Sequence, residues 1–230
     1  MKSTLRALAM LLSYPGGPLK THIAELRQVI ETEPLLKKRD RAAIMPLLQR
    51  IEQSSLLDLQ IEYSGLFDSS RALSLHVFEH IHGESRERGQ AMINLGEEYA
   101  EHGFYMVTEE LPDFIPLFLE FVSCLPIEQG RDWLSHPAHV FVALEERLKQ
   151  RDSDYAGVFQ LLTYLAGDKP DMEAVQELLQ RERTADTPTA DEEWEEKPVT
   201  FSAPPTMQPE SGLVSRLKAA GKLIVSSSDN

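Results

Sequence analysis

The stretch Ile115-Pro116-Leu117-Phe118-Leu119-Glu120-Phe121-Val122 decides how this chain folds. Apart from Glu120, its side chains are apolar nearly all round a helix, and a helix of this kind is buried on every side. The stretch therefore predicts the central helix of a bundle. It is also far shorter than the roughly 20 apolar residues that span a bilayer, so we expect no transmembrane helix.

The sequence on both sides of this stretch has the same helical character. Apolar residues recur at helical spacing almost everywhere, and strand signals are nearly absent. Helices are predicted after a Ser3 cap, from Pro18, after an Asp40 cap, from Ser54 or Ser55 to Phe67, from a Ser85 cap to Gly103, from Pro112 through the central stretch, and at 138–150, 153–166 and 170–183. The segment 68–83 is expected to be less regular and partly extended. The predicted fold class is all-α, a single helical bundle of about nine to ten helices with a disordered acidic C-terminal tail.

The composition changes abruptly after Arg183. Residues 184–211 hold five prolines and seven acidic residues against one lysine, so they cannot bury enough apolar surface to offset the entropy of ordering. We expect an all-helical domain at 1–183 and a disordered, acidic, proline-rich linker at 184–211. The tail at 212–230 regains helical patterning with basic side chains, and forms either a short amphipathic docking helix or a frayed end.

The charge and cysteine content narrow the class of protein. The formal net charge is −14, which argues against a nucleic-acid surface and favours a basic partner. The same negative charge is also explained by solubility alone, so a basic partner and plain solubility both stay open as explanations. The single Cys124 excludes an internal disulfide, and no secretory leader opens the sequence, so we expect a cytoplasmic protein. Cys124 is expected to pack as a small apolar side chain.

The polar residues are densest between Leu75 and Met92. His76, Glu79 and His80 spell H-x-x-E-H, a zinc-hydrolase signature in which two histidines on one helical turn hold the metal. That chemistry needs a regular helix and a third ligand from elsewhere, and Gly83 leaves little room for the helix. The sequence has no glycine-rich phosphate loop, no G-x-S-x-G elbow and no C-x-x-C pair. We expect no catalytic residues, no metal site and no cofactor of its own.

The same block supports a different interpretation when its neighbours are included. Residues 63–68, 78–86 and 88–92, followed by Glu110-Leu111-Pro112-Asp113 and by 116–121, resemble in order and spacing the NarJ type of nitrate reductase assembly chaperone. The resemblance extends from about Leu8 to Ala166. One departure is Phe114, where many relatives carry a histidine, so no role of that histidine transfers to this chain.

The resemblance implies an all-helical redox-enzyme maturation chaperone that is not an enzyme. Such a protein binds the N-terminal segment of the catalytic alpha subunit of a respiratory nitrate reductase. It holds the apoenzyme in the cytoplasm for molybdenum cofactor insertion and membrane docking. The implied partners are that peptide and apoenzyme, with molybdenum cofactor delivery proteins as a further partner class, and no nucleic acid. The alternatives are a chaperone for another molybdenum enzyme with a twin-arginine leader, and the zinc hydrolase.

A peptide-binding chaperone needs an apolar groove and acidic groups for a basic peptide. We expect residues 67–84 to form one wall, with Phe78, Ile81 and the histidines facing a floor that includes Leu117 and Phe121. An open alternative is that the acidic residues pair with Arg71, Arg86 and Arg88 inside the bundle. The candidate peptide-binding residues are Tyr63, Phe67, His76, Phe78, Glu79, His80, His82, Glu84, Arg86, Arg88, Asp113, Leu117, Glu120 and Phe121.

Overall fold

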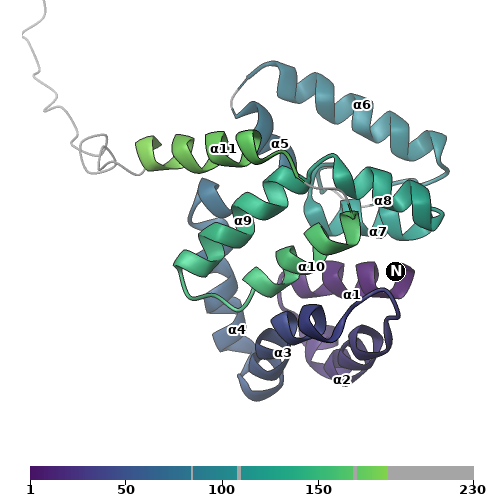
Figure 1. Cartoon of the computed structure of the whole chain (residues 1–230), viewed down its shortest axis with the longest axis vertical. Helices are drawn as coiled ribbons and strands as arrows, with labels where there is room; N and C mark the ends of the chain where they lie inside the picture. The colour runs from purple at the N-terminus through teal and green to yellow at the C-terminus, as the bar shows by residue number, and fades with distance from the viewer. Residues whose placement is uncertain (84, 108–109, 168–169, 186–230) are drawn as a thin grey trace, which may run out of the picture. The chain divides into compact units, whose positions relative to one another are not determined.

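The computed structural model describes residues 1–83, 85–107, 110–167 and 170–185. These residues form α1 (Lys2–Leu12), α2 (Gly17–Thr32), α3 (Lys38–Gln53), α4 (Leu56–Tyr63), the π-helical turn η1 (Ser64–Asp68), the 3₁₀ turn η2 (Arg71–Leu73), α5 (Val77–His82), α6 (Glu87–Glu101), α7 (Ile115–Cys124), α8 (Ile127–Ser135), α9 (Ala138–Gln150), α10 (Ala156–Ala166) and α11 (Met172–Ala185) (Figure 1). Within these ranges the only β-type pairing is an isolated antiparallel bridge between His76 and Phe114. The predicted all-α class is confirmed.

The core of the bundle forms around two helices that are apolar on most sides. In α7, eight of the ten residues are buried, and this helix packs against α1. In α10, which packs against α9, α3 and α8, Gly157 lies against the backbone of α3. A Cβ atom at Gly157 would approach the carbonyl oxygen of Ala43 to 2.1 Å, so only glycine permits this close approach. The stretch 115–122 is therefore central, as the sequence predicts.

Most of the predicted helix ends are close to the observed ones. Ser55 caps α4 by accepting a hydrogen bond from the Asp58 backbone N–H, and Ser85 accepts one from Glu87 at the start of α6. Gly103 ends α6 at φ +76°, with Gly103 N–H donating to Ala100 and Phe104 N–H to Tyr99, which is a Schellman motif.

Three expectations about the helices need correction. Asp40 lies inside the first turn of α3, where its carboxylate accepts from the backbone N–H of Lys37, so the N-cap is Lys37, three residues before the predicted cap. Pro112 precedes α7, whose first residue is Ile115 and whose early proline is Pro116. The helices α5 and α8 were not predicted, because each is short and α8 lacks a side-chain N-cap, so the described residues hold eleven α-helices.

The last described helix, α11, ends at Ala185, which is also the last described residue. The predicted linker from 186 onward and the predicted tail lie outside the described residues. Among the helices described, none has both the length and the apolar character that crossing a membrane requires.

Candidate peptide-binding groove

Asp113 joins the two sequence blocks that carry the resemblance. It is 1% exposed, and its carboxylate accepts hydrogen bonds from the Phe78 backbone N–H at 3.0 Å and from His76 Nδ1 at 3.1 Å. Its backbone carbonyl accepts from the Val77 N–H at 3.1 Å. Asp113 thus caps the start of α5, where His76 is the N-cap residue. The hydrogen bond to Asp113 raises the pKa of His76 above its ordinary value, although burial opposes this shift.

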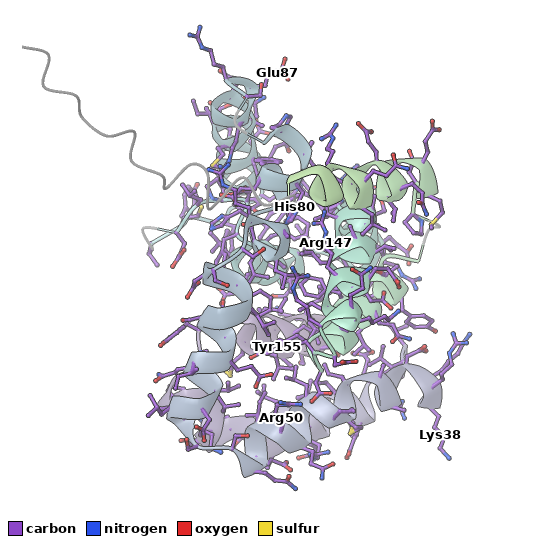
Figure 2. The ribbon with its side chains drawn as sticks, turned by 90° about the vertical axis from the view of Figure 1, so that its left-hand side faces the viewer. Lys38, Arg50, His80, Glu87, Arg147 and Tyr155 are labelled. Atoms are coloured by element: carbon purple, nitrogen blue, oxygen red, sulfur yellow. The ribbon has the colours of Figure 1, made fainter. Side chains whose placement is uncertain are left out.

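His80 is buried on α5, close to Arg147 of α9 (Figure 2). Its Nε2 lies 2.8 Å from the Ser74 carbonyl oxygen, and its Nδ1 lies 3.3 Å from Nη1 of the buried Arg147. A carbonyl only accepts and a guanidinium only donates, so His80 is neutral with its proton on Nε2. Burial lowers the pKa of His80 to about 4. Arg147 also donates to the carbonyl oxygens of Ala72 and Leu178, so it ties α9 to η2 and α11.

These contacts separate the two histidines of the H-x-x-E-H pattern. His76 is at the N-cap and donates to Asp113, whereas both ring nitrogens of His80 are engaged by Ser74 and Arg147. No trio of histidine, cysteine or carboxylate side chains within the described ranges is placed to hold a metal ion. The two imidazoles therefore do not form the shared helical turn that a zinc hydrolase uses.

Glu79 supports the alternative in which acidic residues pair inside the bundle. Its carboxylate accepts from Arg88 Nη2 at 3.0 Å, which ties α5 to α6. Burial opposes ionisation of Glu79, but hydrogen bonding from Ser74 and the charges of Arg88 and His76 lower its pKa overall. Arg86 is exposed at the N-cap of α6. Glu84 lies outside the described residues.

A groove follows the line between α1 and α7, which run antiparallel. At one end Arg6 Nε donates to Ser123 Oγ at 3.1 Å, and Arg6, Met10 and Cys124 line a hollow of about 550 Å³. At the other end a hollow of about 520 Å³ is lined by residues that include Tyr63, His76, Phe114 and Leu117. The two hollows share Ser13, Tyr14 and Glu120, so they adjoin each other, and together they are called the groove between α1 and α7.

The two ends of this groove differ in charge. Asp68, Glu110 and Glu120 line the end near η1, and all three side chains are exposed. Within the described part of the chain, no ion pair engages any of these three carboxylates. Burial is the main cause that raises the pKa of Tyr63, and the negative charges of Asp68 and Glu110 raise it further. At the opposite end the groove is lined by the positively charged side chain of Arg6.

The structure brings only some of the predicted site residues together. Tyr63, His76, Leu117 and Glu120 line the groove between α1 and α7. A separate hollow of about 500 Å³ beside α11 is lined by residues that include Glu79, His80 and His82. Phe78 and Asp113 line a third, smaller pocket of about 200 Å³ with Ile81, Phe118 and Trp133. The structure therefore distributes residues 67–84 among three hollows, and which of them a peptide contacts stays a prediction.

Two predicted floor or wall residues are instead part of the core. Phe121 is fully buried, with its ring centroid 4.3 Å from that of Tyr99 and 5.0 Å from that of Trp133. Phe67 is buried against the rings of Tyr63 and Tyr155, at centroid distances of 4.8 Å and 5.1 Å. Their role is to hold the groove in place.

Sequence reasoning missed several groove residues. Cys124 is exposed and lines the groove, contrary to the expectation that it packs inside. Asp68 and Glu110 also line the groove and lie within the segments that carry the resemblance, but they are not among the predicted peptide-binding residues. Arg6 and Met10 lie four residues apart on the exposed face of α1, and the charge of Arg6 among the apolar residues that follow Thr4 was a usable signal.

The fold belongs to a known class of α-helical bundles. It is similar to the crystal structure of a candidate redox enzyme maturation protein from Archaeoglobus fulgidus, with a TM-score of 0.52 and 24% identity, covering 73% of this chain and 94% of that chain. The chain belongs to the family described as nitrate reductase delta subunit, whose sequence model matches residues 20–160.

Two curated relatives cover most of the chain. It is 42% identical to the nitrate reductase molybdenum cofactor assembly chaperone NarJ of Escherichia coli K12, over 85% of this chain and 84% of that protein. It is 36% identical to NarW of the same strain, over 86% of this chain and 83% of that protein. The resemblance drawn from residues 63–121 is confirmed, and the family is one of assembly chaperones rather than hydrolases.

Proposed function

We propose that this protein is an assembly chaperone for a nitrate reductase. It binds the N-terminal segment of the catalytic alpha subunit in the groove between α1 and α7. It holds the apoenzyme in the cytoplasm while the client's molybdenum cofactor is inserted, and it delays docking of the client on its membrane anchor. The chaperone leaves afterwards and carries out no catalytic step.

The observation that carries this proposal is the composition of the groove. Its apolar side chains, among them Met10, Phe114 and Leu117, suit the apolar face of an amphipathic helix. The carboxylates of Asp68 and Glu120 suit lysine or arginine on the same peptide. Because no ion pair within the described residues occupies these carboxylates, binding a basic peptide breaks no existing salt bridge there.

The mechanism follows from binding alone. A chaperone that binds one state of the client stabilises that state by RT ln(1 + c/Kd), where c is the free chaperone concentration, so a bound chaperone keeps the N-terminal segment away from other surfaces. The net charge of −14 speeds the encounter with a basic segment and makes the association rate sensitive to salt.

The test is isothermal titration of the full chain with a synthetic peptide that copies the first residues of the nitrate reductase alpha subunit from the same genome. We expect saturable one-to-one binding that Glu120→Gln weakens. Glu97→Gln, which removes an exposed carboxylate on α6 away from the groove, is the matched control and should leave the affinity unchanged.

A second peptide separates this client from the other client class. A twin-arginine leader of another molybdenum enzyme carries the same kind of positive charge, so charge alone cannot distinguish the two. Tighter binding of that leader than of the alpha-subunit peptide would overturn the choice of client. Absence of binding by the alpha-subunit peptide and by the full apoenzyme would overturn the proposed function itself.

A further inference from the structure

The groove between α1 and α7 carries a positively charged side chain at one end and negatively charged side chains at the other. Arg6 lies at the end where α1 begins, and Asp68 and Glu110 lie at the end near η1. Glu120 lies between them, because it lines both hollows. His76 also lines the acidic end, but its imidazole donates to the carboxylate of the buried Asp113, which offsets its positive charge. The end near η1 therefore keeps an excess of negative charge.

The groove is long enough for direction to matter. The residues of α7 that line it run from Pro116 to Cys124, which at 1.5 Å per helical residue is about 12 Å, or a little over two helical turns. A helix of that length has a positive N-terminal end and a negative C-terminal end, because its peptide dipoles add along the axis. A free α-amino group adds a full positive charge at the first end.

We infer that the client helix binds in one direction. Its N-terminal end lies at Asp68 and Glu110, and its C-terminal end lies toward Arg6 and Cys124. This inference rests on the proposed function, since it assigns the orientation of the peptide in the same groove. The reverse orientation would place the positive helix end against Arg6 and the negative end against two carboxylates. The arrangement selects for a client whose recognised segment begins at, or very near, its own N-terminus.

The lone exposed cysteine is a natural probe of this orientation. Cys124 lines the Arg6 end of the groove, so a nitroxide attached there broadens the proton resonances of whichever peptide end lies near it. We expect broadening at the C-terminal end of the bound alpha-subunit peptide and little at its first residues. The mirror experiment places the nitroxide on Ser69→Cys in a Cys124→Ser background. Ser69 is exposed and adjoins Asp68, so the first residues of the peptide should then broaden.

The two labels together decide the orientation. Broadening of the first residues from Cys124, or of the last residues from position 69, would overturn the inference while leaving peptide binding intact. If the label on Cys124 blocks the groove, the label at position 69 decides alone. If unlabelled protein fails to bind the peptide in titration, the proposed function fails, and that outcome is distinct from a reversed pattern.

A charge test gives an independent readout. Acetylating the peptide's α-amino group should weaken binding to the natural chain by about two- to fivefold, the range of an exposed charge pair. In the Asp68→Asn, Glu110→Gln double variant the same acetylation should have almost no effect, and in Arg6→Gln it should keep its full effect. An equal loss in all three proteins would show that the α-amino group does not meet these carboxylates.

Discussion

Replacing His80 with glutamine should remove a large part of the protein's sensitivity to mild acid. In the folded chain His80 is 8% exposed, donates from Nε2 to the Ser74 carbonyl and faces Arg147. Burial lowers its pKa to about 4 from the ordinary 6.5. Between about pH 6.5 and about pH 4, His80 binds a proton in the unfolded chain but stays neutral in the folded chain. The contribution of neutral His80 to stability is therefore lost as the pH falls through this window.

The magnitude follows from the shift in pKa. A shift from 6.5 to about 4 corresponds to about 3 kcal/mol over the whole window, of which about 2 kcal/mol is lost between about pH 7.5 and about pH 5. Glutamine keeps an amide N–H for the Ser74 carbonyl and an oxygen for Arg147, but it does not titrate. His80→Gln costs stability at every pH because it packs less well, so the informative quantity is the difference between the two pH values.

The assay is urea denaturation of the natural chain and of His80→Gln at both pH values. Because all other groups titrate alike in the two proteins, the variant should lose about 2 kcal/mol less than the natural chain on acidification. His76→Gln, at the N-cap of the same short helix, is the matched control and should act with the opposite sign. Asp113 raises the pKa of His76, so that residue stabilises the fold at low pH and loses the effect as the pH rises through its folded pKa. Equal acid losses in His80→Gln and the natural chain would refute the reasoning.

Three further outcomes are expected. Gly157→Ala should destabilise the fold by about 2 kcal/mol or more in thermal unfolding, because the new Cβ clashes with the Ala43 carbonyl oxygen. Gly17→Ala is the control and should change the stability little, because its Cβ would contact no other atom. Asp113→Asn should lower the pKa of His76, followed by the imidazole proton shifts in an NMR titration; an unmoved pKa would show that another group sets it. Iodoacetamide should alkylate Cys124 in the free protein, and saturating alpha-subunit peptide should slow the reaction; an unchanged rate would place the peptide elsewhere.

The fold was readable from the sequence because burial leaves a periodic trace. The stretch 115–122 is apolar on almost every side, and in the structure all of its residues except Glu120 are buried. Caps such as Ser55 and Gly103 were visible for the same reason, since each acts on backbone groups within a few residues. The short α5 and α8 escaped because short helices show little periodicity and take their stability from tertiary packing.

The groove was harder to predict because its residues come together only through the path of the chain. His76 and His80 are four residues apart and look equivalent in the sequence, yet one donates to Asp113 and the other faces Arg147. Which partner each meets depends on residues 37 and 67 positions away, and local spacing holds no record of them. The same holds for Asp68 and Glu110, which line one hollow although 42 residues separate them in the chain.

In the proposed binding mode Asp113, although recognisable in the sequence, is a residue that does not touch the client. Its carboxylate is 1% exposed and is engaged by His76 and the Phe78 backbone, so it fixes where α5 begins relative to α7. Buried polar groups held in this way tolerate little change, because losing one partner leaves the other unsatisfied in a dry interior. The exposed carboxylates of Asp68, Glu110 and Glu120 carry no such constraint, so, in the proposed binding mode, substitutions there change client preference while the scaffold of the bundle stays fixed.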